Sequence, residues 1–77
     1  MNTFPKVGIG IVTYNNEKHI YRLFKDLEKI SCLISLILII DNCSTDKTVD
    51  LIESHSRQIF QKKGVPFEFS KNQTNIG

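Results

Sequence analysis

The sequence predicts an α/β fold in which helices pack against a parallel sheet. Three apolar stretches, at about residues 6–13, 35–40 and 65–70, contain the β-branched and aromatic side chains that strands favour. The two longer segments between them have the apolar spacing of amphipathic helices. The order strand, helix, strand, helix, strand, with short links, requires parallel strands joined by right-handed crossovers.

The first strand, at about residues 6–13, is apolar on both of its faces. A parallel strand that is covered by helices on each side has this pattern, so we expect a three-layer, Rossmann-like arrangement. Gly8 and Gly10 interrupt the apolar side chains. Glycine within a strand often marks the close approach of a neighbour, and we expect that role here rather than phosphate binding.

The first helix is predicted at about residues 16–30. Asn15 or Asn16 is a suitable N-cap, and Glu17 places a negative charge in the first turn, where the helix dipole favours it. Apolar residues follow at helical spacing: Ile20, Leu23, Phe24, Leu27 and Ile30. They predict an amphipathic helix of about four turns.

The second strand, at about residues 35–40, is followed by a loop dense in residues that favour turns and helix starts. We expect a second helix at about residues 45–61. Ser44 is its predicted N-cap, and Asp46 is expected in its first turn.

The end of the second helix is predicted at Lys62-Lys63-Gly64. Positive charge and glycine are both favoured at a helix C-terminus. The third strand is then expected at about residues 65–70. Pro66 must fall at its start or on a sheet edge, because proline has no N–H for the ladder.

Composition argues against several classes of partner. The 77 residues have room for one small domain, and the net charge of +2 is weak. Basic and acidic residues are interleaved on the first predicted helix, whereas nucleic-acid binders show a clustered basic face. We therefore expect no nucleic-acid partner.

The cysteines and histidines do not suggest a disulfide framework or a metal site. Cys32 and Cys43 show no Cys-x-x-Cys spacing, and His19 and His55 have no partner at ligand spacing. The longest apolar run, residues 32–40, is far below the roughly 20 residues of a membrane-spanning helix. We expect a reducing, cytoplasmic location, and no metal bound by this chain alone.

Polar side chains follow each of the three predicted strands at its carboxyl end. The candidate nucleotide-binding residues are Thr13, Tyr14, Asn15, Asp41, Asn42, Lys71 and Asn72. Because the carboxyl ends of parallel strands meet at one sheet edge, where open α/β sheets hold ligands, we expect these side chains to form one site. The constellation points to a nucleotide ligand.

Each main candidate has a chemical role and an alternative. Asp41 can accept hydrogen bonds from a base imide or a ribose hydroxyl, or it can satisfy backbone N–H groups of its own loop. Tyr14 can stack on a base, or it can pack at the sheet rim. Lys71 suits a phosphate or a base carbonyl, or it is simply solvated.

Three segments together resemble the start of a family 2 nucleotide-sugar glycosyltransferase. The first is Ile-Val-Thr-Tyr-Asn at residues 11–15, and the second is Ile-Ile-Asp-Asn-Cys-Ser-Thr-Asp at residues 39–46. The third, at residues 72–77, is similar to the beginning of the family's Asn-x-Gly segment. The resemblance covers nearly the whole chain, and both main motifs stand in the family's order and separation.

The resemblance implies a fold and a set of contacts. Residues 1–77 would be the N-terminal part of a nucleotide-diphospho-sugar transferase (GT-A) domain, truncated, with strand order third, second, first. Tyr14 would lie against the nucleobase and Asp41 would bond its imide N–H. The nucleoside pocket would be lined by Thr13, Asn15 and Lys71.

The resemblance also implies an activity for the full-length enzyme. The donor would be a UDP- or dTDP-sugar, and the acceptor hydroxyl would belong to a glycan or a lipid-linked sugar, as in cell-surface polysaccharide biosynthesis, with membrane association of the longer protein. A divalent metal, Mg or Mn, would be held by an Asp-x-Asp motif. This chain contains neither that motif nor the general base, so we expect no catalytic residue and no transfer from it alone.

The main alternative is a non-catalytic α/β module that self-associates. In the resembling fold another strand would lie beside residues 7–13, and an exposed strand edge is a template for pairing. We therefore expect homodimers formed through the first strand. A receiver domain is disfavoured because Thr13-Tyr14-Asn15 replaces its acidic pair, and a dinucleotide-binding domain because no Gly-x-Gly-x-x-Gly opens the first helix.

Overall fold

The computed structural model describes residues 6–74 and confirms the predicted α/β order. The elements in chain order are β1 (Val7–Thr13), α1 (Glu17–Lys29), the 3₁₀ turn η1 (Ser31–Leu33), β2 (Ile34–Asp41), α2 (Thr48–His55), the π-helical segment η2 (Ser56–Gln61) and β3 (Phe67–Lys71). Among these residues, no helix has both the length and the apolar character needed to cross a membrane.

The three strands form one parallel sheet in the order β1-β2-β3. This is the predicted order of third, second, first, read from the other edge. β2 is central and pairs with both neighbours. Thr13 is level with Asp41, and Asp41 is level with Lys71, so the three strands end in one row.

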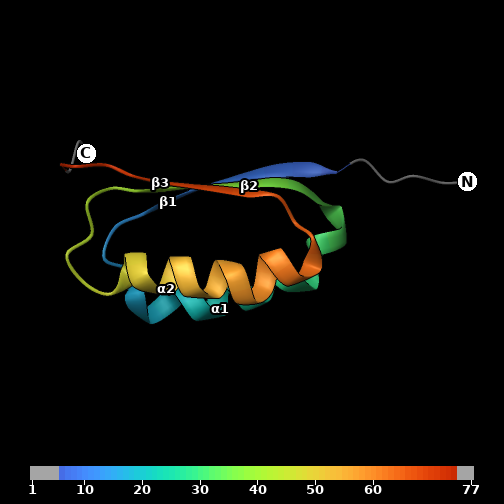
Figure 1. Ribbon diagram of the computed structural model, residues 1–77, viewed down its shortest axis with the longest axis horizontal. Helices are drawn as coiled ribbons and strands as arrows, with labels where there is room; N and C mark the ends of the chain where they lie inside the picture. Colours follow the sequence, from blue (N-terminus) through green and yellow to red (C-terminus); the bar gives the residue numbers. More distant parts are fainter. Residues whose placement is uncertain (1–5, 75–77) are drawn as a thin grey trace, which may run out of the picture.

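Both helices cover the same face of the sheet, and the expected third layer is not present within residues 6–74. Figure 1 shows α1 and α2 together on one side of the strands. The physical reason is that two right-handed crossovers that advance in the same direction along a sheet place their helices on the same face. The apolar pattern of β1 predicted coverage on both sides, but the topology supplies it on only one.

The uncovered face of the sheet carries a shallow apolar groove. It has a volume of about 230 Å³ and is lined by Gly8, Ile9, Gly10, Leu36 and Leu38. The close approach predicted at the two glycines is not seen among the described residues. A Cβ added at Gly10 would meet nothing within 4 Å, and one at Gly8 would have only ordinary contacts at 3.9 Å.

The core lies between the sheet and the two helices. Ile37 and Ile39 of β2 are fully buried, and the rings of Phe24 and Phe60 lie 4.8 Å apart between their centroids. The predicted apolar stripe of α1 is buried at Ile20, Phe24 and Leu27. Ile30, the last predicted member of that stripe, is instead the C-cap and is 42% exposed.

The second helix begins three residues later than expected. α2 starts at Thr48 and continues as η2 through Gln61, so the predicted start at residue 45 is wrong. Ser44 and Asp46 both lie in the preceding loop, where their side chains have other partners. The predicted end is confirmed, because Gly64 has a φ of +72°, the left-handed conformation that favours glycine.

Candidate functional site

The polar side chains that follow the three strands are brought together at one sheet edge. We call this edge the rim, and it comprises residues 13–17, 41–48 and 71–72. The backbone ladder continues beyond the strands, since the Asn42 N–H donates to the Thr13 carbonyl and the Asn72 N–H to the Asp41 carbonyl, each at 2.8 Å. The predicted convergence of the strand ends is therefore present.

Asp41 lies fully buried at the centre of the rim. Its Oδ1 accepts hydrogen bonds from the Thr13 hydroxyl at 2.7 Å and the Ser44 hydroxyl at 2.6 Å, and its Oδ2 accepts one from the Ser44 N–H at 2.8 Å. Burial alone raises the pKa of Asp41, but these hydrogen bonds outweigh it and hold the pKa below its usual value. The carboxylate thus joins the end of β1 to the loop after β2. Its bond from the Ser44 N–H matches the alternative role considered for Asp41, that of an acceptor for backbone N–H groups of its own loop.

The loops after β1 and β2 are joined directly to each other. The Asn15 N–H donates to the Ser44 hydroxyl, and the Thr45 N–H donates to the Asn15 side-chain oxygen, each at 2.8 Å. Ser44, expected as a helix N-cap, therefore connects the loops instead. Asn15 and Cys43 have φ values of 49° and 63°, a conformation that costs most residues about 1–2 kcal/mol and that asparagine tolerates best.

Asp46 and Thr48 form a second connection, which the sequence analysis missed. The Asp46 Oδ1 accepts the Thr48 N–H at 2.9 Å as well as the Thr48 hydroxyl, and its Oδ2 accepts the Glu17 N–H at 3.3 Å. The Asn16 N–H donates to the Thr48 hydroxyl at 2.7 Å. The available signal was the Asp-x-Thr spacing just before the helix, because an acid two residues ahead of a helical N–H is a typical cap.

Asp46 is also held in its charged form by these contacts. Burial raises its pKa, while the side-chain and backbone hydrogen bonds from Thr48 and the backbone hydrogen bond from Glu17 lower it by more. Its negative charge lies at the amino ends of both α1 and α2, where helix dipoles favour an anion.

The side chains that a ligand can reach are those around this framework. Tyr14 is 47% exposed, which does not match the alternative of a packed tyrosine. Asn72 donates from its side-chain amide to the Asn42 side-chain oxygen at 3.2 Å, and Lys71 is exposed at the end of β3. The last residues of the segment at 72–77, from 75 onward, lie outside the described residues.

Within residues 6–74, no three His, Cys, Asp or Glu side chains are grouped so that they could hold an ion. The oxygens of Asp41 and Asp46 accept hydrogen bonds from Thr13, Ser44, Thr48 and Glu17.

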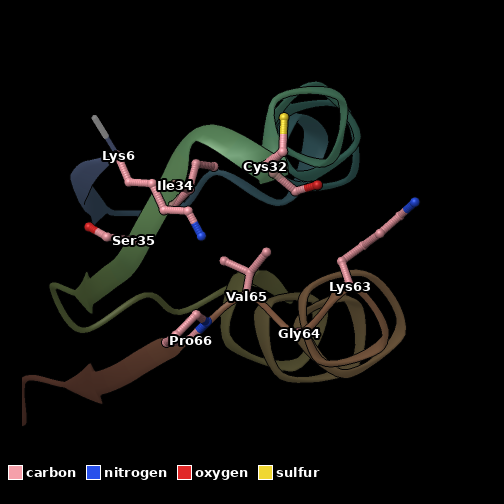
Figure 2. Close-up of a pocket in the computed structure, with 9 residues that line it drawn as sticks. Lys6, Cys32, Ile34, Ser35, Lys63, Gly64, Val65 and Pro66 are labelled. Carbon is pink, nitrogen blue, oxygen red and sulfur yellow. The ribbon is translucent and has the colours of Figure 1, made fainter. Parts of the chain in front are cut away.

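A larger hollow lies at the opposite edge of the sheet, where the strands begin. It has a volume of about 460 Å³, and Lys6, Ile34, Val65 and Pro66 are among its lining residues. Figure 2 shows that Lys63, at one side of it, extends away from Val65 and Pro66. None of the predicted site residues lines this pocket, so it is separate from the rim.

The family profile described as "Glycosyl transferase family 2" matches residues 8–75, which include all three strand ends. Neither the curated proteins nor the solved structures gave a match.

Proposed function

The chain belongs to glycosyl transferase family 2, and from this membership we propose that its rim binds the nucleoside part of a UDP- or dTDP-sugar donor. The complete enzyme would transfer the sugar to an acceptor hydroxyl on a glycan or a lipid-linked sugar. The observation that carries the proposal is the level row of Thr13, Asp41 and Lys71 at the carboxyl edge of a parallel sheet. Ligands of open α/β sheets bind at this edge.

The exposed and half-buried rim residues supply the direct contacts in this proposal. Tyr14 offers a half-exposed aromatic face on which a pyrimidine can stack. The amides of Asn42 and Asn72 lie within hydrogen-bond distance of each other and present polar groups for the base edge. Lys71 supplies a positive charge for a phosphate or a base carbonyl, and Asn15 would lie at the side of the bound nucleoside, next to Tyr14.

Asp41 and Thr13 act mainly by positioning these groups. The carboxylate is buried and accepts three hydrogen bonds from within the rim. A base imide could donate to this carboxylate only if the hydrogen bond from Ser44 or Thr13 were broken. We therefore assign Asp41 the role of fixing the loop that carries Asn42, and we assign the base contacts to the exposed groups.

The proposed role of these residues is binding and not transfer. Transfer to a hydroxyl requires a group that accepts the acceptor's proton and a means of stabilising the departing diphosphate. Within residues 6–74 the carboxylates of Asp41 and Asp46 both accept hydrogen bonds from other groups of the rim. The proposal therefore gives these residues a part in holding the donor and none in the transfer step.

Calorimetric titration with uridine diphosphate tests the proposal. Replacing Tyr14 with Ala should weaken binding by about 5- to 150-fold, because stacking a base on an aromatic ring is worth about 1–3 kcal/mol. Tyr14→Phe keeps the ring and should bind like the native chain.

The matched control for this titration is Tyr21→Ala. Tyr21 is the only other tyrosine, and it is exposed on α1, where its ring packs edge-on against His55. Its replacement should leave affinity unchanged. Equal affinities of the Tyr14→Ala and Tyr21→Ala variants would contradict the proposed contact.

One observation favours a second role, self-association through β1. Within residues 6–74, β1 is an edge strand that pairs only with β2, and the sheet face beside it is apolar and uncovered, with Val12 71% exposed. Edge strands of this kind tend to pair with another chain. The titration separates the two roles, because a purely structural module would show no affinity for the nucleotide.

A further inference from the structure

Two loops that are distant in sequence carry Tyr14, Asn15 and Asn42 of the rim. The first, residues 14–16, joins β1 to α1, and the second, residues 42–47, joins β2 to α2. Both contain a non-glycine residue in the left-handed conformation, Asn15 and Cys43. Such conformations persist only where the surrounding contacts determine them, so the contacts between the loops decide where Tyr14 lies.

Asp46 and Thr48, which we call the loop clamp, provide the deepest of these contacts. The Thr48 side chain is fully buried. Its hydroxyl has one proton, and the Asn16 N–H can only donate to it, so that proton must be directed to Asp46. The hydrogen bonds therefore run in one direction, from the Asn16 N–H through the Thr48 hydroxyl to the Asp46 carboxylate.

The clamp reaches Tyr14 through one more residue. The Tyr14 N–H donates to the Asn16 side-chain oxygen at 2.7 Å, and the Asn16 backbone is held by Thr48. Asp46 also accepts the Glu17 N–H, the first of α1. One carboxylate thus holds two successive N–H groups at the end of the turn that follows Tyr14, that of Asn16 through Thr48 and that of Glu17 directly.

We propose that Asp46 and Thr48 are positioning residues of the nucleotide site: they hold Asn16, and through it Tyr14, in place for the base. The identity of the ligand in this inference rests on the proposed function. The hydrogen bonds that hold Asn16 are observed independently of it. Neither residue needs to touch the nucleotide. Their effect on affinity comes from the order that they impose on Tyr14 before the ligand arrives.

Thr48→Val and Thr48→Ser separate positioning from simple packing. Valine has nearly the shape of threonine but cannot accept the Asn16 N–H, whereas serine keeps the hydroxyl. Thr48→Val removes both hydrogen bonds of the hydroxyl and should weaken uridine diphosphate binding by about tenfold, in line with the net worth of a buried hydrogen bond. Thr48→Ser should restore affinity to within about twofold of the native chain.

A second readout does not depend on the ligand. The chain has two tyrosines and no tryptophan, so in a Tyr21→Phe background Tyr14 alone emits. The fluorescence anisotropy of Tyr14 should fall in Thr48→Val and recover in Thr48→Ser. Ser56→Ala is the matched control, because the buried Ser56 hydroxyl has no hydrogen-bond partner among the described residues, and it should change neither readout.

Asp46→Asn keeps the test decisive if Thr48→Val fails to fold. The asparagine oxygen can still face Thr48, but its amide then meets the Glu17 N–H donor to donor, so anisotropy should fall here as well. Unchanged anisotropy in the folded variants, or an equal fall in Thr48→Ser, would overturn the proposal. Failure of the native chain to bind the nucleotide would count against the proposed function alone, because anisotropy decides the clamp independently.

Discussion

At the scale of single residues, the rim depends on charged oxygens that are surrounded by donors. A buried carboxylate is costly unless it is hydrogen-bonded, and Asp41 accepts three hydrogen bonds from Thr13 and Ser44. Asp46 accepts a comparable set from Thr48 and Glu17. The hydroxyl and backbone donors around each carboxylate offset the cost of removing it from water, and the same contacts fix the loops.

These contacts predict that the chain loses stability in acid. The pKa values of Asp41 and Asp46 are lowered in the folded state. A lowered folded pKa contributes stability above the unfolded pKa, about 3.9 for an aspartic acid, and that contribution is lost as the pH falls through the folded value. The free energy of unfolding, measured with urea, should therefore stay roughly constant above about pH 5 and decline below about pH 4.

Asp41→Asn identifies the source of the acid sensitivity. The variant should be less stable by about 1–3 kcal/mol at neutral pH, because its amide would face the Ser44 donors. On acidification, its free energy of unfolding should also fall by less than that of the native chain. Asp50→Asn, at an exposed position of α2, serves as the control. An acid profile of Asp41→Asn that parallels the native one would contradict this account.

The sequence predicted which residues meet at the rim but not the direction in which they face. Polar groups after apolar strands, together with parallel pairing, placed Thr13, Asp41 and Lys71 at one edge. Whether Asp41 faces the solvent or its own loop depends on the left-handed turn at Cys43, which brings the Ser44 N–H and hydroxyl onto the carboxylate. No local preference of cysteine signals such a turn.

At the scale of elements, the strands and α1 followed the predicted pattern closely, and the second helix did not. Its start was displaced because Asp46 acts as an acceptor ahead of the helix and not as a member of its first turn. Its later half, η2, is a π-helical segment. Apolar spacing cannot distinguish that form from an α-helix, because Ile59 and Phe60 are buried in either case.

The end of the second helix gives a prediction at this scale. Gly64 has a φ of +72°, where a side chain costs about 1–2 kcal/mol, so Gly64→Ala should lower the free energy of unfolding by about that amount. Gly10→Ala is the matched control, since Gly10 lacks a positive φ and has open space around it. It should be neutral or stabilising by up to about 1 kcal/mol. Chemical denaturation of both variants checks this, and equal effects would count against it.

At the scale of the whole molecule, the sheet has one covered face and one uncovered face. The topology follows from the handedness of the two crossovers, and it could have been derived from the predicted strand order alone. The expectation of three layers relied instead on the apolar pattern of β1. That pattern is real, but residues 6–74 contain no element that covers Val12, Leu36 and Leu38 on their exposed side.

The uncovered face and the free edge of β1 predict self-association of the chain. Sedimentation velocity should show a concentration-dependent shift from monomer to dimer. Val12→Lys should favour the monomer, because it places a charge on the apolar face beside the edge strand. Ile30→Lys changes a comparably apolar, exposed residue at the end of α1 and should leave the dimer intact. A native chain that stays monomeric at high concentration would refute this prediction.

The central proposal is that a pyrimidine nucleotide binds at the rim. The most direct measurement is the change in backbone amide chemical shifts of the ¹⁵N-labelled chain during titration with uridine diphosphate. The largest chemical-shift changes are expected at residues 13–16, 41–44 and 71–72, at the carboxyl edge of the sheet. Changes concentrated instead around Lys6 and Val65 in the pocket at the opposite edge, or no changes at all, would contradict it.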